Sequence, residues 1–60
     1  MKHYLFECID ENDENEGEEF LVGADSYTEA QEIAYNNFGK CKCHGKMTEE
    51  EAENSGLDEY

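Results

Sequence analysis

The run DENDENEGEE, from Asp10 to Glu19, constrains the fold of this chain more than any other part of the sequence. It holds seven carboxylates in ten residues, and its Asn residues and Gly17 supply turn chemistry. Acidic residues in such a turn are expected to be exposed to solvent. Because segments with the pattern of β-strands precede and follow it, the run is expected to form the long acidic tip of a hairpin.

The segments on either side of this tip have the composition of strands. HYLFECI, residues 3–9, is rich in aromatic and branched residues and alternates two sets of side chains. This pattern predicts a strand with Tyr4, Phe6 and Cys8 directed inward. EFLVGA, residues 19–24, predicts the second strand of the hairpin.

A helix is indicated between residues 26 and 39. Ser26 is followed three residues later by Glu29, which is the spacing of a capping box, and Gly39 is a residue type that ends helices. Apolar side chains recur at helical spacing, so one stripe can lie across the hairpin. The stripe comprises Tyr27, Ala30, Ile33, Ala34 and Phe38.

The last third of the chain predicts one more strand and a short helix. KCKCHGKM, residues 40–47, alternates thiols with Lys and His side chains, which favours a third strand with its cysteines inward and its lysines outward. Thr48 and Glu51 repeat the capping-box spacing and begin a short acidic helix that Gly56 ends. The tail, residues 57–60, is expected to be ordered only where one of its apolar side chains docks.

These elements predict a single α+β domain of ββαβ(α) order over residues 1–60. A three-stranded, mainly antiparallel sheet would carry the main helix on one face and be followed by the short acidic helix. Sixty residues support only a small core, and repulsion among the carboxylates lowers its stability, so a homodimer or another partner would help to complete the fold. The three segments that matter most are the acidic tip at 10–19, the main helix at 26–39 and the acidic C-terminal segment at 48–60.

The charge of the chain restricts its partners. Seventeen Asp and Glu residues face four Lys and no Arg, which gives a net charge of −13. A surface this acidic repels DNA, RNA and anionic membranes and attracts basic protein surfaces. Direct binding to nucleic acid is therefore disfavoured, and a basic protein partner is expected.

The chain shows no targeting or membrane pattern. No stretch has the roughly eighteen apolar residues of a membrane span, and the N-terminal residues lack the apolar core of a signal peptide. Three cysteines cannot form a complete disulfide framework. These features predict a soluble, cytoplasmic protein with free thiols.

The sequence carries no pattern of catalysis. Its acids cluster where exposure is expected, and exposed carboxylates are poor general acids. It has neither a glycine-rich phosphate loop nor a nucleophile elbow, and a chain this short barely encloses a substrate pocket. We expect neither an enzyme nor a bound cofactor.

Two metal-binding patterns are present but incomplete. Cys8, Cys41, Cys43 and His44 form a ligand set that zinc accepts. However, a single residue separates the two later cysteines, and a strand directs His44 to the opposite face. Buried, inert thiols are the favoured interpretation, and zinc is the alternative. The acidic run begins like an EF-hand loop but lacks the glycine and the final glutamate of that loop.

The remaining feature is the display of negative charge. In an extended segment alternate side chains stand about 6.8 Å apart, so Glu14, Glu16 and Glu18 would form a row similar in scale to alternate phosphates of B-DNA, spaced about 3.4 Å along each strand. The short second helix adds further acids, and tyrosines are candidate anchors because interfaces favour aromatic residues. The candidate partner-binding residues are Asp13, Glu14, Glu16, Glu18, Tyr35, Glu49, Glu50, Glu51, Glu53 and Tyr60.

The order of elements, the segment VGADSYTEAQEIA at residues 22–34, the free cysteines and the dense acids together resemble the small accessory proteins of bacteriophages and mobile elements. Over residues 3–47 the chain is similar in architecture and charge to anti-CRISPR and anti-restriction inhibitors, some of which act as nucleic-acid mimics. The resemblance implies a non-catalytic inhibitor that evades host defence in the cytoplasm of the host cell. It would occupy the basic groove of a nucleic-acid-binding protein, such as a CRISPR effector.

We therefore hypothesise that the protein inhibits a host defence or nucleic-acid-processing protein by binding its basic surface. The alternative is a small interaction or structural protein of a phage or mobile element, stabilised by zinc or by self-association. Salt-sensitive binding to a basic partner would support the first hypothesis. Bound metal or a stable oligomer would support the second.

Overall fold

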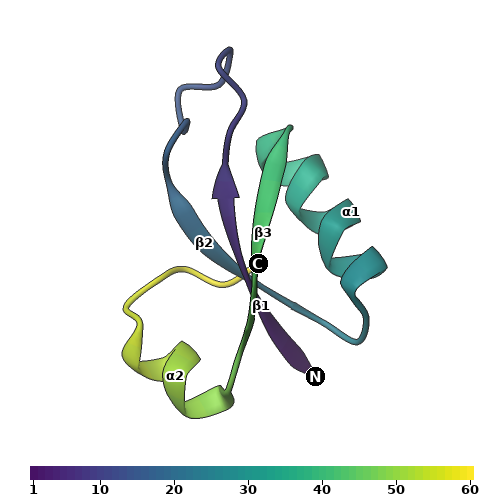
Figure 1. The fold of residues 1–60 in the computed structure, drawn as a ribbon, viewed down its shortest axis with the longest axis vertical. Helices are drawn as coiled ribbons and strands as arrows, with labels where there is room; N and C mark the ends of the chain where they lie inside the picture. The colour runs from purple at the N-terminus through teal and green to yellow at the C-terminus, as the bar shows by residue number, and fades with distance from the viewer.

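The computed structural model describes all 60 residues and contains a three-stranded sheet and two helices, as Figure 1 shows. The predicted α+β fold and its order of elements are confirmed. The elements are β1 (Lys2–Cys8), β2 (Glu19–Ala24), α1 (Tyr27–Phe38), β3 (Cys41–Met47) and α2 (Glu49–Asn54).

The first strand of the chain lies at the centre of the sheet. The strand order is β2-β1-β3, and both neighbours of β1 are antiparallel to it. The hairpin of β1 and β2 is regular, whereas the pairing of β1 with β3 shifts between Leu5 and Phe6. Leu5 lies opposite Gly45 and Phe6 opposite Cys43, so His44 is the extra residue of a β-bulge.

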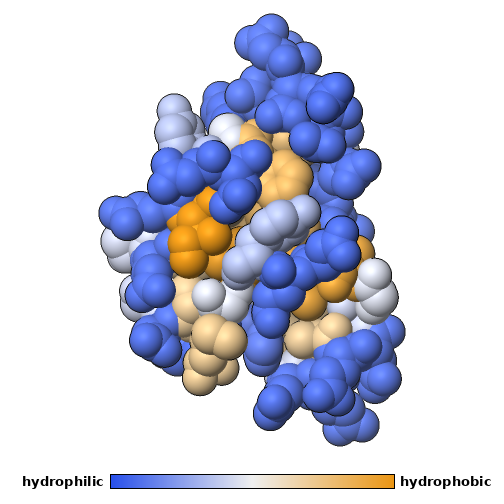
Figure 2. All heavy atoms as spheres, turned by 180° about the vertical axis from the view of Figure 1, so that it is seen from behind, coloured by the Kyte–Doolittle hydropathy of each residue, from blue (hydrophilic) through white to orange (hydrophobic).

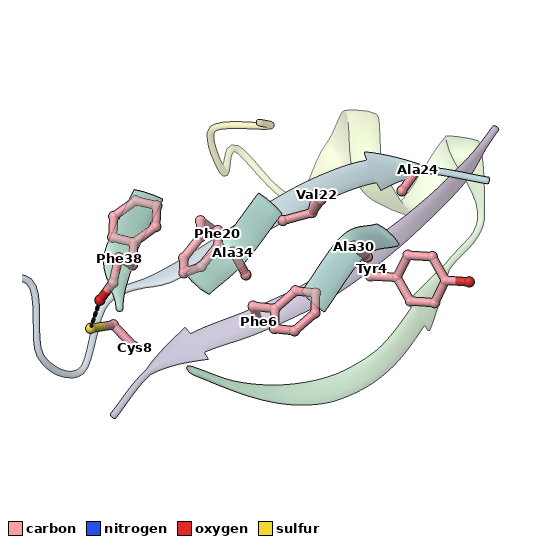
Figure 3. Close-up of a cluster of buried hydrophobic side chains, with 9 residues drawn as sticks. All are labelled: Tyr4, Phe6, Cys8, Phe20, Val22, Ala24, Ala30, Ala34 and Phe38. Atoms are coloured by element: carbon pink, nitrogen blue, oxygen red, sulfur yellow. Dashed lines mark hydrogen bonds between the residues drawn. The ribbon is translucent and has the colours of Figure 1, made fainter. Parts of the chain in front are cut away.

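The core lies between α1 and one face of the sheet (Figure 3). Alternate residues of β1 and β2 point to this face, as the period of a strand requires. Phe20 of β2 stacks on Phe38 of α1, with ring centroids 4.0 Å apart. The buried cluster comprises Tyr4, Phe6, Cys8, Phe20, Val22, Ala24, Ala30, Ala34 and Phe38.

The apolar stripe expected on α1 is buried along most of its length. Ala30, Ala34 and Phe38 are buried, and Ile33 packs at the margin of the core. Tyr27 departs from the prediction because it is 46% exposed. Its ring lies 6.0 Å from that of Tyr4 and covers the edge of the cluster.

The C-terminal tail is ordered along the outer edge of β2. Leu21 donates its amide hydrogen to Asp58 O at 2.8 Å and accepts a hydrogen bond at its own carbonyl from the Tyr60 amide, also at 2.8 Å. A third hydrogen bond runs from the Gly23 amide to Tyr60 O at 3.0 Å. The tail therefore covers the edge of β2, while the outer edge of β3 carries no strand.

Candidate interaction surface

The acidic tip, residues 10–18, extends from the sheet at one end of the molecule (Figure 1). At its base, Cys8 donates its amide hydrogen to Glu18 O at 2.9 Å and accepts one from the Gly17 amide at 2.8 Å. Gly17 has a φ of 87°, a left-handed conformation that glycine adopts without steric cost. The hairpin thus closes just after β1 and holds the acids between these contacts away from the core.

Successive turns fold the tip. The Asp13 amide donates to Asp10 O at 3.0 Å, and the Glu16 amide donates to Asp13 O at 3.1 Å. The carboxylates of Asp10 and Asp13 also accept hydrogen bonds from the amides of Asn12 and Asn15, at 3.0 and 2.8 Å. Each Asp therefore directs its own turn, as the side chain of Asp commonly does.

These turns overturn the expectation of an extended acidic row. Glu14, Glu16 and Glu18 do not alternate along a straight strand, because the tip is made of turns between β1 and β2. The tip instead holds its acidic residues on one folded loop at the end of the hairpin. Its six acids are Asp10, Glu11, Asp13, Glu14, Glu16 and Glu18.

No cation is paired with the tip. The only ion pairs in the structure join His3 to Glu59 and, at 2.8 Å, His44 to Glu7. Figure 2 shows the tip end of the molecule covered by hydrophilic side chains, with apolar side chains gathered toward the middle of that face. The negative charge of the tip is therefore uncompensated within the chain.

The second acidic group belongs to α2, at the opposite end of the molecule (Figure 1). Thr48 and Glu51 form the predicted capping box, in which each side chain accepts from the other's amide at 3.1 Å. Glu51 is thereby engaged in the fold, whereas Glu49, Glu50 and Glu53 have no partner in the chain. The two acidic groups lie at opposite ends of a molecule 32 Å long, so a partner would have to extend along the whole molecule to contact both.

The two candidate tyrosines occupy different environments. Tyr35 of α1 is 67% exposed and lines a groove of about 570 Å³ between α1 and the start of β3. Phe6 and Cys41 form the apolar part of this groove, and Lys40 stands at its side. Tyr60 packs its ring on Phe20 and Phe38 but keeps 45% of its surface exposed, so Tyr35 is the more accessible of the two candidate anchors.

The structure does not assemble the zinc ligands that the sequence suggests. Cys41 and Cys43 point toward the core, next to Cys8, as expected for alternate residues of a strand. His44 lies on the other face of the sheet, where its Nε2 contacts Glu7. No group of three or more His, Cys, Asp or Glu side chains is arranged to hold a metal ion.

Sequence reasoning missed two features of this surface. The groove between α1 and β3 depends on how far the helix lies from the edge strand, which no local pattern encodes. The turns of the tip had a signal, because the triplet DEN occurs twice in succession and each copy places an Asp two residues before an Asn.

No family model, characterised protein or solved structure was found to be similar to this chain. No helix is long and apolar enough to cross a lipid bilayer.

Proposed function

We propose that this protein is a non-catalytic inhibitor that binds a basic surface which otherwise holds nucleic acid. The surface would belong to a host defence or nucleic-acid-processing protein, such as a CRISPR effector. The observation that carries the proposal is the acidic tip, a loop folded by turns whose six acidic residues are paired with no cation. Such a group favours contact with Lys and Arg side chains of a partner.

The density of charge supports mimicry of a nucleic acid. A net charge of −13 along a longest dimension of 32 Å amounts to about one net negative charge per 2.5 Å. Double-stranded DNA carries about one per 1.7 Å of its axis. The chain therefore approaches the charge density that a DNA-binding groove is built to attract.

The length of the molecule supports the same proposal. Its 32 Å is close to one helical turn of B-DNA, about 34–36 Å. Because the tip and the acids of α2 lie at its two ends, a groove that follows a full turn of duplex would meet both groups. The tip is the primary contact, because it holds more unpaired carboxylates than α2 does.

The experiment is a salt-dependent binding comparison between the chain and a tip variant. The variant carries Asp13→Asn, Glu14→Gln, Glu16→Gln and Glu18→Gln. Asparagine at position 13 retains an oxygen that can accept the Asn15 amide, so the turn is preserved. A bacterial lysate is passed over each protein at low and high ionic strength, and recovered proteins are tested for competition with their nucleic acid.

A second variant controls for the loss of net charge. It also removes four charges, but from exposed side chains outside the tip that form no hydrogen bond or ion pair in the chain. Its substitutions are Asp25→Asn, Glu29→Gln, Glu32→Gln and Asp58→Asn. The proposal expects a nucleic-acid-binding protein to be recovered by the chain and by this control, and to be lost with the tip variant and at high salt. Equal recovery by the two variants, or simultaneous binding of nucleic acid, would contradict it.

Self-association is a second candidate, favoured by one observation. The outer edge of β3 is unpaired, whereas the tail covers that of β2, and an open edge is a template for another strand. Lys42 and Lys46 lie on β3, so pairing two copies through this edge would bring like charges together. Sedimentation analysis at several salt and protein concentrations tests this candidate. An oligomer whose association becomes tighter as salt is added supports self-association, and a monomer under all these conditions refutes it.

A further inference from the structure

Cys8 and Cys41 lie opposite each other where β1 ends and β3 begins. Ile9 and Lys40 are the next pair of residues along the ladder, and the Ile9 amide donates to Lys40 O at 2.9 Å. They are therefore a hydrogen-bonded pair. In an antiparallel ladder, hydrogen-bonded and non-hydrogen-bonded pairs alternate. Cys8 and Cys41 are therefore a non-hydrogen-bonded pair, in which Cα atoms are about 4.5 Å apart. A disulfide spans about 4.4 to 6.8 Å between Cα atoms.

The two thiols also converge on the C-terminal end of α1. Cys8 Sγ donates to Phe38 O at 3.5 Å, as Figure 3 shows, and Cys41 Sγ donates to Gly39 O at 3.4 Å. Burial, followed by the charge and hydrogen bond of the Cys8 thiol, raises the pKa of Cys41 to about 11. The two side chains therefore face the same end of α1 and are opposite in register.

Only one of these two thiols can be reached from solvent. Cys8 is fully buried, whereas Cys41 is partly exposed and lines the groove between α1 and β3. The third cysteine, Cys43, lies opposite Phe6 and has no thiol facing it across the ladder. The fold thus selects a single pair, with Cys41 as its accessible member.

We propose that Cys8 and Cys41 form a reversible cross-strand disulfide when the protein meets a low-molecular-weight disulfide such as oxidised glutathione. The Cys41 thiolate attacks one sulfur of oxidised glutathione, whose S–S bond breaks and releases one glutathione. Cys8 then attacks the Cys41 sulfur, and its proton passes to the second glutathione as that thiol leaves. The two protein thiols lose two electrons and two protons, and oxidised glutathione becomes two molecules of glutathione.

The cross-link would act on the base of the acidic tip. Cys8 accepts and donates the hydrogen bonds that close the hairpin at Gly17 and Glu18, so joining it to β3 fixes the tip to a second strand. The oxidation also removes the two S–H donors from the carbonyls of Phe38 and Gly39. Because the thiolate is the attacking species, the high pKa of Cys41 makes the reaction slow at neutral pH.

The sequence allows the link to be located directly. The folded chain is incubated with oxidised glutathione at mildly alkaline pH, remaining thiols are blocked with iodoacetamide, and the denatured protein is digested with trypsin. Cleavage after Lys40 and Lys42 places the three cysteines in separate peptides, which are residues 3–40, 41–42 and 43–46. The proposal expects residues 3–40 joined to 41–42 with a loss of two hydrogens, reversed by dithiothreitol.

Other products would overturn the proposal. These are a link between residues 3–40 and 43–46, a link between 41–42 and 43–46, or glutathione adducts with no link inside the chain. The same reaction in concentrated urea is the control, and a mixture of links is expected there because the fold no longer selects a pair. Cys43→Ser should keep the link and Cys41→Ser should abolish it, while the map of the unaltered chain decides even if a variant misfolds.

Discussion

The ring of Tyr60 meets the ring of Phe38 edge to face, with centroids 5.1 Å apart and an angle of 85° between the planes. The same tyrosine meets Phe20 in the same manner, at 5.6 Å and 89°. A residue of the tail thus completes the aromatic cluster that joins α1 to β2. Tyr60 is therefore a packing residue in this structure, and its mutation is expected to act through stability.

Tyr60→Ala should lower the free energy of unfolding by about 1–2 kcal/mol, because edge-to-face aromatic pairs contribute beyond the area that they bury. Urea unfolding followed by circular dichroism measures the change. Tyr35→Ala is the matched control, since Tyr35 is 67% exposed and makes no aromatic contact, and its effect should stay within about 0.5 kcal/mol. Equal losses in the two variants would show that the tail does not dock in solution.

Ser26→Ala should weaken the start of α1. The Ser26 hydroxyl accepts a hydrogen bond from the Glu29 amide at 3.2 Å, and loss of such a cap typically lowers stability by about 1 kcal/mol. Thermal unfolding measures the loss, and Thr28→Ala, two residues further along the exposed side of the helix, serves as control. A melting temperature that Ser26→Ala leaves unchanged would argue against the cap.

Gly39→Ala should destabilise the junction between α1 and the acidic tip. Gly39 has a φ of 75°, and an added Cβ would stand 2.8 Å from Asp10 Oδ2. With a ψ of −134°, this backbone lies in a region that is essentially restricted to glycine, and it costs a residue with a side chain about 1–3 kcal/mol. Gly56→Ala provides the comparison, because Gly56 has a φ of 74° with open space around it. Because of the contact with Asp10, Gly39→Ala should lose more stability in urea unfolding than Gly56→Ala does, and equal losses would contradict this role of Asp10.

Added salt should raise the melting temperature. The unpaired carboxylates repel one another in the folded chain, and raising ionic strength from about 0.01 M to about 0.15 M shortens the screening length from roughly 30 Å to roughly 8 Å. Differential scanning calorimetry measures the shift. The tip variant with four amides should shift less, and a melting temperature that ignores salt in both proteins would mean that the repulsion is too weak to matter.

Alkaline pH should weaken the fold through Cys41. Its pKa is raised from 9.0 in the unfolded chain to about 11 in the folded one. The stability that the protonated Cys41 thiol contributes is therefore fully present below pH 9. Between pH 9 and 11 the unfolded chain releases this proton first, and stability declines. Because tyrosines and lysines also titrate there, the quantity to measure is the difference in urea unfolding between the chain and Cys41→Ser. If the free energies of unfolding of the two proteins depend on pH in the same way, the raised pKa of Cys41 is contradicted.

Local signals made most of the fold predictable. Ser26 and Thr48 each cap a helix at the predicted position, although the reciprocal bond of a capping box forms only at Thr48. The alternating pattern of residues 3–9 yields a strand with the expected inward side chains. Each of these signals depends on neighbours within a few residues. The acidic tip between two strands follows from the same kind of evidence.

The remaining features depend on contacts between distant segments. The tail lies on β2 through backbone hydrogen bonds to Leu21 and Gly23, and Tyr60 packs on aromatic rings of two other elements. His44 becomes a bulge only through its pairing with β1. Among the candidate binding residues, Tyr35 and the glutamates of the tip form no side-chain hydrogen bond or ion pair in the chain. Asp13 and Glu51 accept hydrogen bonds from backbone amides, and Tyr60 packs on the core, a division that composition does not reveal.

The central position of β1 has a consequence for assembly of the protein. Its partner β2 is next along the chain, whereas β3 arrives only after the whole of α1, so the hairpin can form first because short loops close fastest. In a folding intermediate that has the hairpin but not yet β3, the other edge of β1 is unpaired, and unpaired strand edges promote aggregation. The like charge at the end of the same hairpin would then keep two unfinished molecules apart.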